Sequence, residues 1–348
     1  MQRGIVYALT AAVLFGASTP LAKRLVGNIH PLVLAGLLYA GSGGGLALVL
    51  AARKLRAGAG LAIRWPAARD LPWLAGAILL GGVAGPVLLM VGLTTSHAAT
   101  ASLLLNLEAV LTALLAWVVF RENVDVRIAL GMALIIAGGG VLSWAPEAGA
   151  ISRGSLFVAA ACLCWALDNN LTRIVSSNDA VVIAGLKGVV AGTVTLAAAT
   201  ALGHPLPAPG EIVAAALVGF FGYGVSLALF VLALRHLGTA RTGAYFSVAP
   251  FFGTALAVLV LHDPVTPQLA AAGLLMAVGV WLHLTERHEH EHAHDAEVHV
   301  HSHRHDLHHR HEHDFAWDGA EPHAHPHVHP ATTHRHPHFP DIDHRHPH

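Results

Sequence analysis

Long apolar segments recur along the first 284 residues, and each is about as long as a membrane is thick. A bilayer core about 30 Å thick needs roughly 20 apolar residues per spanning helix, because the helix must satisfy its own backbone polar groups. The segments lie near residues 4–22, 31–52, 71–92, 98–119, 126–143, 154–174, 179–202, 211–233, 239–261 and 267–284. We therefore predict an all-α integral membrane protein with ten transmembrane helices.

The composition agrees with this class, since 54% of the chain is hydrophobic and only 12% is charged. The run from Gly4 to Pro20 has some features of a secretory signal, but an internal repeat favours a retained helix. Cys162 and Cys164, two apart in one apolar segment, fit neither a disulfide framework nor a CxxC site. We expect them to be packing residues.

The charged loops predict the orientation. If the N-terminus is cytoplasmic, the inside loops carry 11 Lys and Arg residues and the outside loops carry 3. Positive residues favour the cytoplasmic side, and an even number of spans returns the C-terminus to that side. The sequence thus predicts a multi-pass protein of the cytoplasmic membrane with both termini in the cytoplasm.

Two stretches of the first half resemble stretches of the second. Residues 4–25 align with 154–175 at an offset of 150, and residues 105–122 align with 246–263 at an offset of 141. Five spans per half would invert the second copy, an arrangement common in secondary transporters. The predicted domains are residues 1–147, residues 148–284 and a tail at 285–348. The alternative is chance similarity between small, Leu-rich helices.

Several motifs resemble the drug/metabolite transporter superfamily, EamA type. They are "FGASTPLAK" at 15–23, "LEA" at 107–109, "FRE" at 120–122 and "APFFGTALAVLVLHD" at 249–263. Where the family favours Glu-Pro, Glu108 lacks the proline and Pro250 lacks the glutamate. The resemblance covers residues 4–284 and implies solute export or exchange, with substrates from amino acids to drugs and nucleotide sugars. It does not name the solute.

Ionisable residues inside apolar spans cost about 2.5 to 3.5 kcal/mol each and usually mark a pathway. Glu108, with Asn106 nearby, is a candidate proton carrier, because desolvation disfavours its charged form. It could instead be a static hydrogen-bond partner. Because burial of a charge is costly, the partners of each ionisable residue in a span are part of the prediction.

The stretch "CWALDNN" places Asp168, Asn169 and Asn170 around more than half of one helix. These side chains could bind a cation or a proton, or form a hydrogen-bonded knot between helices. Lys187 is expected to pair with Asp168, although it could instead extend towards the membrane surface. The five residues above and Lys187 are our predicted substrate pathway.

The tail holds 22 of the 28 histidines and little apolar periodicity, so we predict that it is disordered. Alternating histidines suit nickel, cobalt, zinc or copper(II), and the lack of cysteine and methionine argues against copper(I). The alternative is a pH-responsive solvated tail. The predicted metal ligands are His288, His290, His292, His294, His299, His301, His303, His305, His308, His309, His311 and His313.

Two functions remain open. The first is an exporter of a divalent transition metal, nickel or cobalt before zinc, whose tail collects the ion. The second is an exporter of amino acids, metabolites or drugs whose tail only senses or buffers metal. No P-loop is visible, so a gradient would drive transport, and we expect no enzyme activity, no required cofactor and no nucleic-acid partner. The lipid bilayer and a small solute are the expected partners, and a homodimer is left open.

Overall fold

The structure is a computed structural model that describes residues 2–57, 66–120, 126–145, 147, 149–175, 180–237, 239–285, 289–294, 297–303, 323–329 and 332–337. Packing divides the chain into two units, Met1–Glu286 and Arg287–His348. The first half of unit one contains α1 (Gln2–Val26), α2 (Pro31–Ala57), the short turn η2 (Ala68–Asp70), α3 (Leu71–Ala77), η3 (Ile78–Ala84), α4 (Gly85–Thr95), α5 (Ala98–Leu104), α6 (Asn106–Phe120) and α7 (Val126–Ser143).

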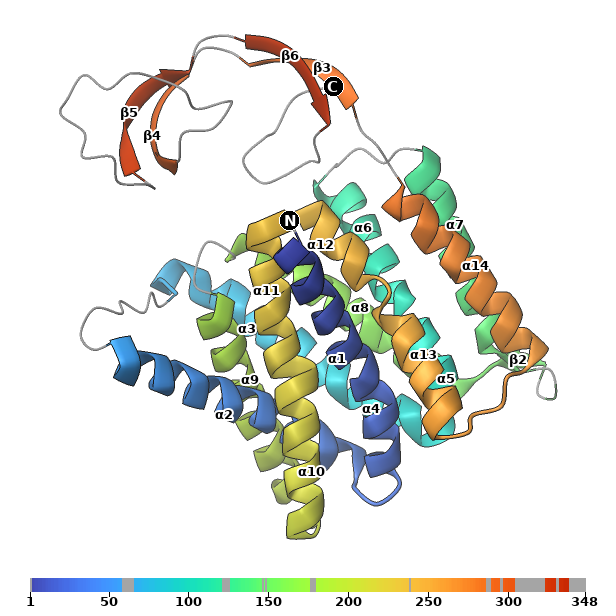
Figure 1. Ribbon diagram of the computed structural model, residues 1–348. Coiled ribbons are helices and arrows are strands. Elements are labelled where there is room, and N and C mark those ends of the chain that lie inside the picture. The colour runs from blue at the N-terminus through green and yellow to red at the C-terminus, as the bar shows by residue number, and fades with distance from the viewer. Residues whose placement is uncertain are drawn as a thin grey trace. The chain divides into compact units, whose positions relative to one another are not determined.

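A small antiparallel pair, β1 (Trp144–Ala145) with β2 (Ala150–Ile151), joins the two halves. The second half contains α8 (Arg153–Ile174), α9 (Ala180–Ala201), α10 (Pro209–Gly219), η4 (Phe220–Val225), α11 (Ser226–Leu237), α12 (Thr239–Phe246), α13 (Ala249–Val260) and α14 (Pro267–Leu284) (Figure 1).

In the part of the chain that the structure describes, nine helical runs are long and apolar enough to cross a membrane. The segment predicted at 239–261 consists of two short helices, α12 and α13, with a turn at Ser247 and Val248 between them. Pro250 lies in the first turn of α13, where a missing N–H breaks no helical hydrogen bond. The protein is an all-helical, multi-pass membrane protein, and the tenth span stays a prediction.

Several elements recur 141 to 143 residues later in the chain. Both η3 and η4 are π-helices, and α7 begins at Val126 while α14 begins at Pro267. The interruption between α5 and α6 at Leu105 recurs as the interruption between α12 and α13. Because π-helices are rare, two of them at matching places give the two halves the same unusual local geometry.

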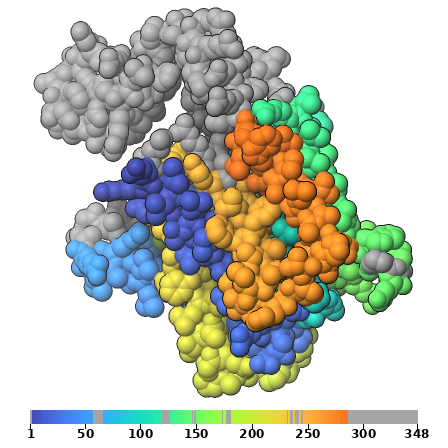
Figure 2. All heavy atoms as spheres, turned by 45° about the vertical axis from the view of Figure 1, so that its right-hand side comes forward, coloured from blue at the N-terminus to red at the C-terminus, as the bar shows by residue number. Residues whose placement is uncertain are grey.

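Several helices pack against helices of the other half. α1 packs against α11 and α13, whereas α8 packs against α4 and α6. α2 packs against α9, and α7 packs against α14 (Figure 1). Figure 2 shows α1, in blue, beside gold and orange segments of the second half. The contacts of α1 with α11 and α13 are thus matched by those of α8 with α4 and α6.

Glycines bring α2 close to its neighbours. A Cβ at Gly43 would collide with the backbone of Val189 on α9, and a Cβ at Gly219 would collide with the backbone of Leu38. In lipid, dispersion between closely packed backbones replaces the hydrophobic effect as the main attraction between helices. These glycines therefore hold together the helices that surround the centre of unit one.

Parts of the tail form short strands in the described residues, and the disorder of the tail as a whole stays a prediction. In its described residues β3 (Glu289–His294) pairs antiparallel with β6 (Thr332–Pro337), and β4 (Glu297–His303) pairs with β5 (His323–His329). Histidine alternates with other residues in much of these strands, and alternation is the period of a β-strand. The histidine spacing therefore fits the strand pairing of these residues.

Candidate functional site

Asp168 is a buried acidic residue of α8. Its side chain is 6% exposed, and Lys187 Nζ of α9 lies 2.6 Å from its Oδ1 and also contacts its Oδ2. Thr172, one turn further along α8, donates from Oγ1 to Asp168 Oδ1 at 2.9 Å. Each charge offsets part of the cost of burying the other. The structure therefore contains the Asp168–Lys187 pair that the sequence favoured.

The Asp168 carboxylate packs directly on Gly81 of η3. A Cβ at position 81 would fall on Asp168 Oδ2, so a glycine is required there. In a π-helix the hydrogen bonds span five residues instead of four, which changes how carbonyls are paired. The Gly81 carbonyl oxygen accepts hydrogen bonds from Tyr39 Oη at 2.7 Å and from Trp165 Nε1 at 3.0 Å. The Gly81 carbonyl thus ties both α2 and α8 to this π-helix, next to the ion pair.

The other half repeats this packing without the charges. Gly222 of η4 faces Ser18 of α1, and a Cβ at Gly222 would collide with Ser18 Cβ. Under the 150-residue offset, Ser18 stands where Asp168 stands in α8. Ser18 Oγ donates to its own helix, at 2.6 Å from Phe15 O. The ion pair is therefore added to an arrangement that both halves share, and packing alone does not account for it.

A second polar group begins at the residue after Asp168. Asn169 Nδ2 donates to Glu108 Oε1 at 2.9 Å and to Thr112 Oγ1 at 3.3 Å, and Asn170 Nδ2 donates to Thr112 O at 3.4 Å. Asn169 is exposed although it lies within a candidate span. An exposed amide inside a span indicates a surface that faces water or a polar cavity.

Asn106 belongs to neither polar group. It is buried at the start of α6, where its Nδ2 donates to Leu103 O at 2.9 Å and lies 3.9 Å from Met276 Sδ of α14. It therefore satisfies a carbonyl at the break between α5 and α6. The structure brings five of the six predicted pathway residues into two adjoining groups and leaves Asn106 apart.

Sequence reasoning missed the residues that support the ion pair: Gly81, Tyr39, Trp165 and Thr172. Trp165 aligns with Phe15 under the 150-residue offset, and that match gives no sign of its bond to Gly81 O. Gly81 lies in "LLGGVAGP", which looks like ordinary small-residue packing. The π-helix that makes Gly81 important leaves no strong signal in a single sequence, whereas Thr172 could have been found from its spacing of four after Asp168.

The predicted metal ligands divide between two places. His290, His292 and His294 lie on β3, and His299, His301 and His303 lie on β4. The remaining six predicted ligands, His288, His305, His308, His309, His311 and His313, lie outside the described residues. Among the side chains that the structure does describe, no three His, Cys, Asp or Glu residues are arranged to hold a metal ion.

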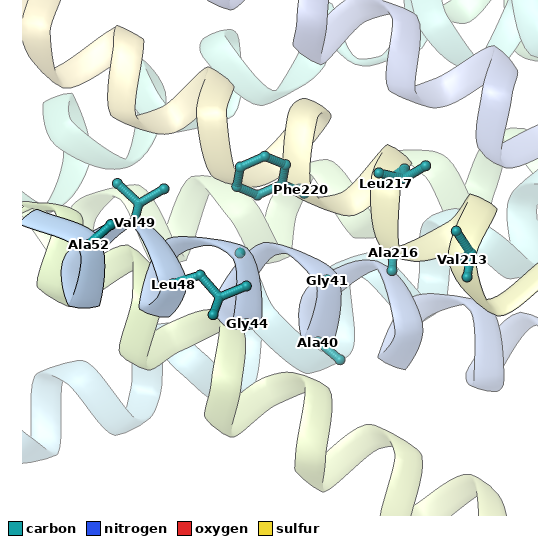
Figure 3. Close-up of a pocket in the computed structure, with 11 residues that line it drawn as sticks. Ala40, Gly41, Gly44, Leu48, Val49, Ala52, Val213, Ala216, Leu217 and Phe220 are labelled. Carbon is teal, nitrogen blue, oxygen red and sulfur yellow. The ribbon is translucent and has the colours of Figure 1, made fainter.

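An apolar groove lies between α2 and α10 (Figure 3). Leu48 of α2 and Leu217 of α10 border it, together with Phe220 of η4 and several small residues. None of the polar side chains described above lines this groove. Its chemistry suits hydrocarbon, so it is not a counterpart of the charged site.

Comparison with known proteins decides the family. The model of the EamA-like transporter family matches residues 2–144 and again residues 152–285. This chain belongs to the EamA-like transporter family. An uncharacterized transporter of Methanothermobacter thermautotrophicus is 30% identical over 295 residues, which cover 80% of this chain and 85% of the relative.

A solved crystal structure supports the fold of this EamA-family protein. The matched region covers 80% of this chain and 94% of the solved chain, with a TM-score of 0.60 and 20% sequence identity. At that identity the likeness concerns the fold alone. The family assignment makes the chain a membrane transporter, and the Asp168–Lys187 pair becomes a candidate part of its transport site.

Proposed function

We propose that this protein is a secondary-active exporter of a small solute, formed by two inverted five-helix repeats that give ten spans. The recurrence of η3, of the interrupted helix and of α7 after 141 to 143 residues supports the repeat. The packing of α1 on helices of the second half, and of α8 on helices of the first, supports it as well. Inverted repeats permit alternating access, in which one half rocks against the other around a central site.

The ion pair is the observation that carries this proposal. Asp168 and Lys187 are charged, buried and held by the π-helix at Gly81, and the corresponding position in α1 is the neutral Ser18. A proton or a cation that binds Asp168 must compete with Lys187. Such competition links binding to a change in the contacts between α8 and α9, as exchange transport requires.

The charge distribution supports an orientation that suits export. The excess of Lys and Arg in alternate loops supports a protein of the cytoplasmic membrane with both termini in the cytoplasm. The tail would then meet its ligands on the side from which an exporter takes its solute.

A divalent transition metal, nickel or cobalt before zinc, is the first solute that we propose. The register of β4 and β5 aligns His299 with His327 and His301 with His325. Opposite positions in an antiparallel pair have Cβ atoms about 4.5–5.5 Å apart, which suits two imidazoles on one ion. Bound metal would collect at the tail and pass to the oxygen ligands around Asp168.

An amino-acid-like zwitterion is the second candidate, and the ion pair itself favours it. The Asp168 carboxylate would bind an ammonium group, while Lys187 would bind a carboxylate. Neighbouring opposite charges are complementary to such a solute. A metal ion, by contrast, would displace Lys187 from Asp168 and leave the ammonium group without a counter-charge.

The test uses vesicles that contain the full-length protein, a version ending at Leu284, or the Asp168→Asn variant. Nickel, cobalt and zinc flux is measured in all three, beside counterflow of a mixture of labelled amino acids. Glu211→Gln is the matched control, because it removes one negative charge at the start of α10, away from the ion pair.

Metal flux that survives truncation but is lost in Asp168→Asn supports metal export through the helices. Amino-acid counterflow without metal flux supports the second solute. If Asp168→Asn transports as well as Glu211→Gln does, the ion pair is not part of the transport site and the proposal fails.

A further inference from the structure

Asp263 is held in place by an unusual turn at the end of α13. His262, just before it, has φ = 58°, and it is the only non-glycine residue with positive φ in the described part of the chain. Such a conformation is costly for a residue with a side chain, and it commonly reverses the chain after a helix. The turn directs the backbone back towards α13, with Asp263 N donating to Ala257 O at 3.3 Å.

The Asp263 side chain caps a helix of the other half. Its Oδ2 accepts a hydrogen bond from Ala99 N at 2.8 Å, and the side chain is 11% exposed. Ala99 is the second residue of α5, so its N–H is one of the groups that a helix cannot satisfy itself. His97, at the N-cap position, makes no side-chain cap. α5 therefore takes its cap from a residue 164 positions later in the chain.

Charge strengthens this contact. The positive end of the α5 dipole faces the Asp263 carboxylate, and a negative group is stabilising there. His97 Nδ1 lies 3.6 Å from Asp263 Oδ1. At the same end, Lys23 Nζ at the end of α1 donates to Leu93 O at the end of α4, at 2.5 Å. The ends of α1, α4 and α13 and the start of α5 are thus tied together.

Below the cap, α5 and α13 touch through small residues. A Cβ at Gly253 of α13 would lie 2.8 Å from Ser102 Oγ of α5 and 2.6 Å from Gly16 O of α1. Ser102 is 1% exposed, and its hydroxyl has no hydrogen-bond partner within the described structure. Thr254 Oγ1 of α13 also reaches Ala99 O of α5 at 3.3 Å, although it lies closer to Pro250 O of its own helix, at 2.9 Å. The Asp263 cap is the shorter of the two hydrogen bonds to Ala99 from this part of the second half, and its acceptor is a carboxylate.

We propose that Asp263 is a positioning residue that holds α5 against the second half, and that its bond to Ala99 breaks whenever the transporter opens at this end. The inference rests on the alternating access proposed above. Because α5 continues through Leu105 into α6, which carries Glu108, release of the cap frees the helix that bears part of the polar site. The charge distribution assigns this end to the outer face.

The experiment measures access to Ser102 directly. In the full chain, Cys162→Ala and Cys164→Ala remove the two native cysteines, and Ser102→Cys introduces a reporter. A membrane-impermeant maleimide is applied to intact cells and, separately, to inverted vesicles. Asp263→Ala removes the cap, Asp263→Asn keeps an oxygen acceptor, and Glu211→Ala is the matched control. Glu211 Oε2 also accepts from a helix-start N–H, that of Ala208 at 3.3 Å, but within one segment.

Asp263→Ala is expected to speed labelling from the end where α5 begins by about fivefold or more, because loss of a cap shifts the closed state by that order. Asp263→Asn and Glu211→Ala are expected to stay within about twofold of the parent. Equal labelling of Asp263→Ala and the parent would overturn the proposal. Failure of Asp263→Asn to restore slow labelling would overturn the cap as its cause.

Labelling requires no transported solute, so this result is separable from the search for a substrate. Faster labelling in Asp263→Ala, with no flux of any tested solute in the parent, would keep the positioning role and overturn only the proposed solutes. A transport defect in Asp263→Ala that Asp263→Asn rescues would tie the cap to the transport cycle.

Discussion

Lys187 Nζ lies 2.6 Å from Asp168 Oδ1, and the two residues join α9 to α8 in the interior of unit one. Removal of one partner from a buried pair leaves an uncompensated charge, which typically costs about 3–5 kcal/mol. Lys187→Met is therefore expected to lower the melting temperature in detergent strongly. The double variant Lys187→Met/Asp168→Asn is expected to recover most of that loss, because no buried charge remains.

Measurements of solute flux distinguish a role of this pair in transport from a role in stability. The stable double variant is expected to have no flux, because neither a proton nor a solute has a charged partner left to displace. A double variant as unstable as Lys187→Met would mean that the ion pair adds stability beyond mutual neutralisation. A double variant with normal flux would remove the pair from the mechanism.

Gly81 is predicted to tolerate no side chain, because a Cβ there would coincide with the Asp168 carboxylate. Gly81→Ala must displace either Asp168 or η3, and overpacking of this kind typically costs about 1–3 kcal/mol. Solute flux in vesicles is expected to fall with it. The matched control is Gly140→Ala on α7, where a Cβ meets nothing within 4 Å and helix propensity favours alanine. Equal flux in the two variants would contradict the role assigned to Gly81.

His30 and His204 lie in loops outside the spans, with their rings stacked 3.5 Å apart. Burial, together with the neighbouring His204, lowers the pKa of His30 below its ordinary value. Its Nδ1 also accepts a hydrogen bond from Leu32 N at 3.3 Å, which requires that nitrogen to be unprotonated. The folded state then binds fewer protons than the unfolded state, so His30 contributes stability at neutral pH that is lost on acidification.

The measurement is the melting temperature in detergent between about pH 7.5 and pH 5, through the ordinary histidine range. His30→Gln is expected to flatten the decline relative to the parent. His204→Gln is expected to flatten it partly, because it removes one of the two causes that act on His30. Identical slopes in all three proteins would show that protonation of His30 is not linked to folding.

The sequence predicted what the spacing of apolar and charged residues determines: the membrane class, most span positions and the pairing of Asp168 with Lys187. It did not predict the support of that pair, because π-helices are rare and the one at Gly81 has no strong signal in a single sequence. Asn106 was grouped with Glu108 from its place in the chain. The break at Leu105 turns it towards Leu103 and Met276 instead. The cap of α5 by Asp263 joins residues 164 positions apart, and no local pattern in either segment announces it.

The strained turn at His262 yields the last prediction. Its φ of 58° suits glycine, whereas a side chain in this region costs about 1–2 kcal/mol. His262→Gly is therefore expected to preserve transport and to leave stability unchanged or slightly raised. His262→Val adds a β-branched side chain that this backbone cannot accommodate easily, so it is expected to lower the melting temperature and to loosen Asp263. With the Ser102→Cys reporter, the valine variant should label faster and the glycine variant at the parental rate. If valine lowers stability without changing the labelling rate, the turn maintains the fold but does not control the cap.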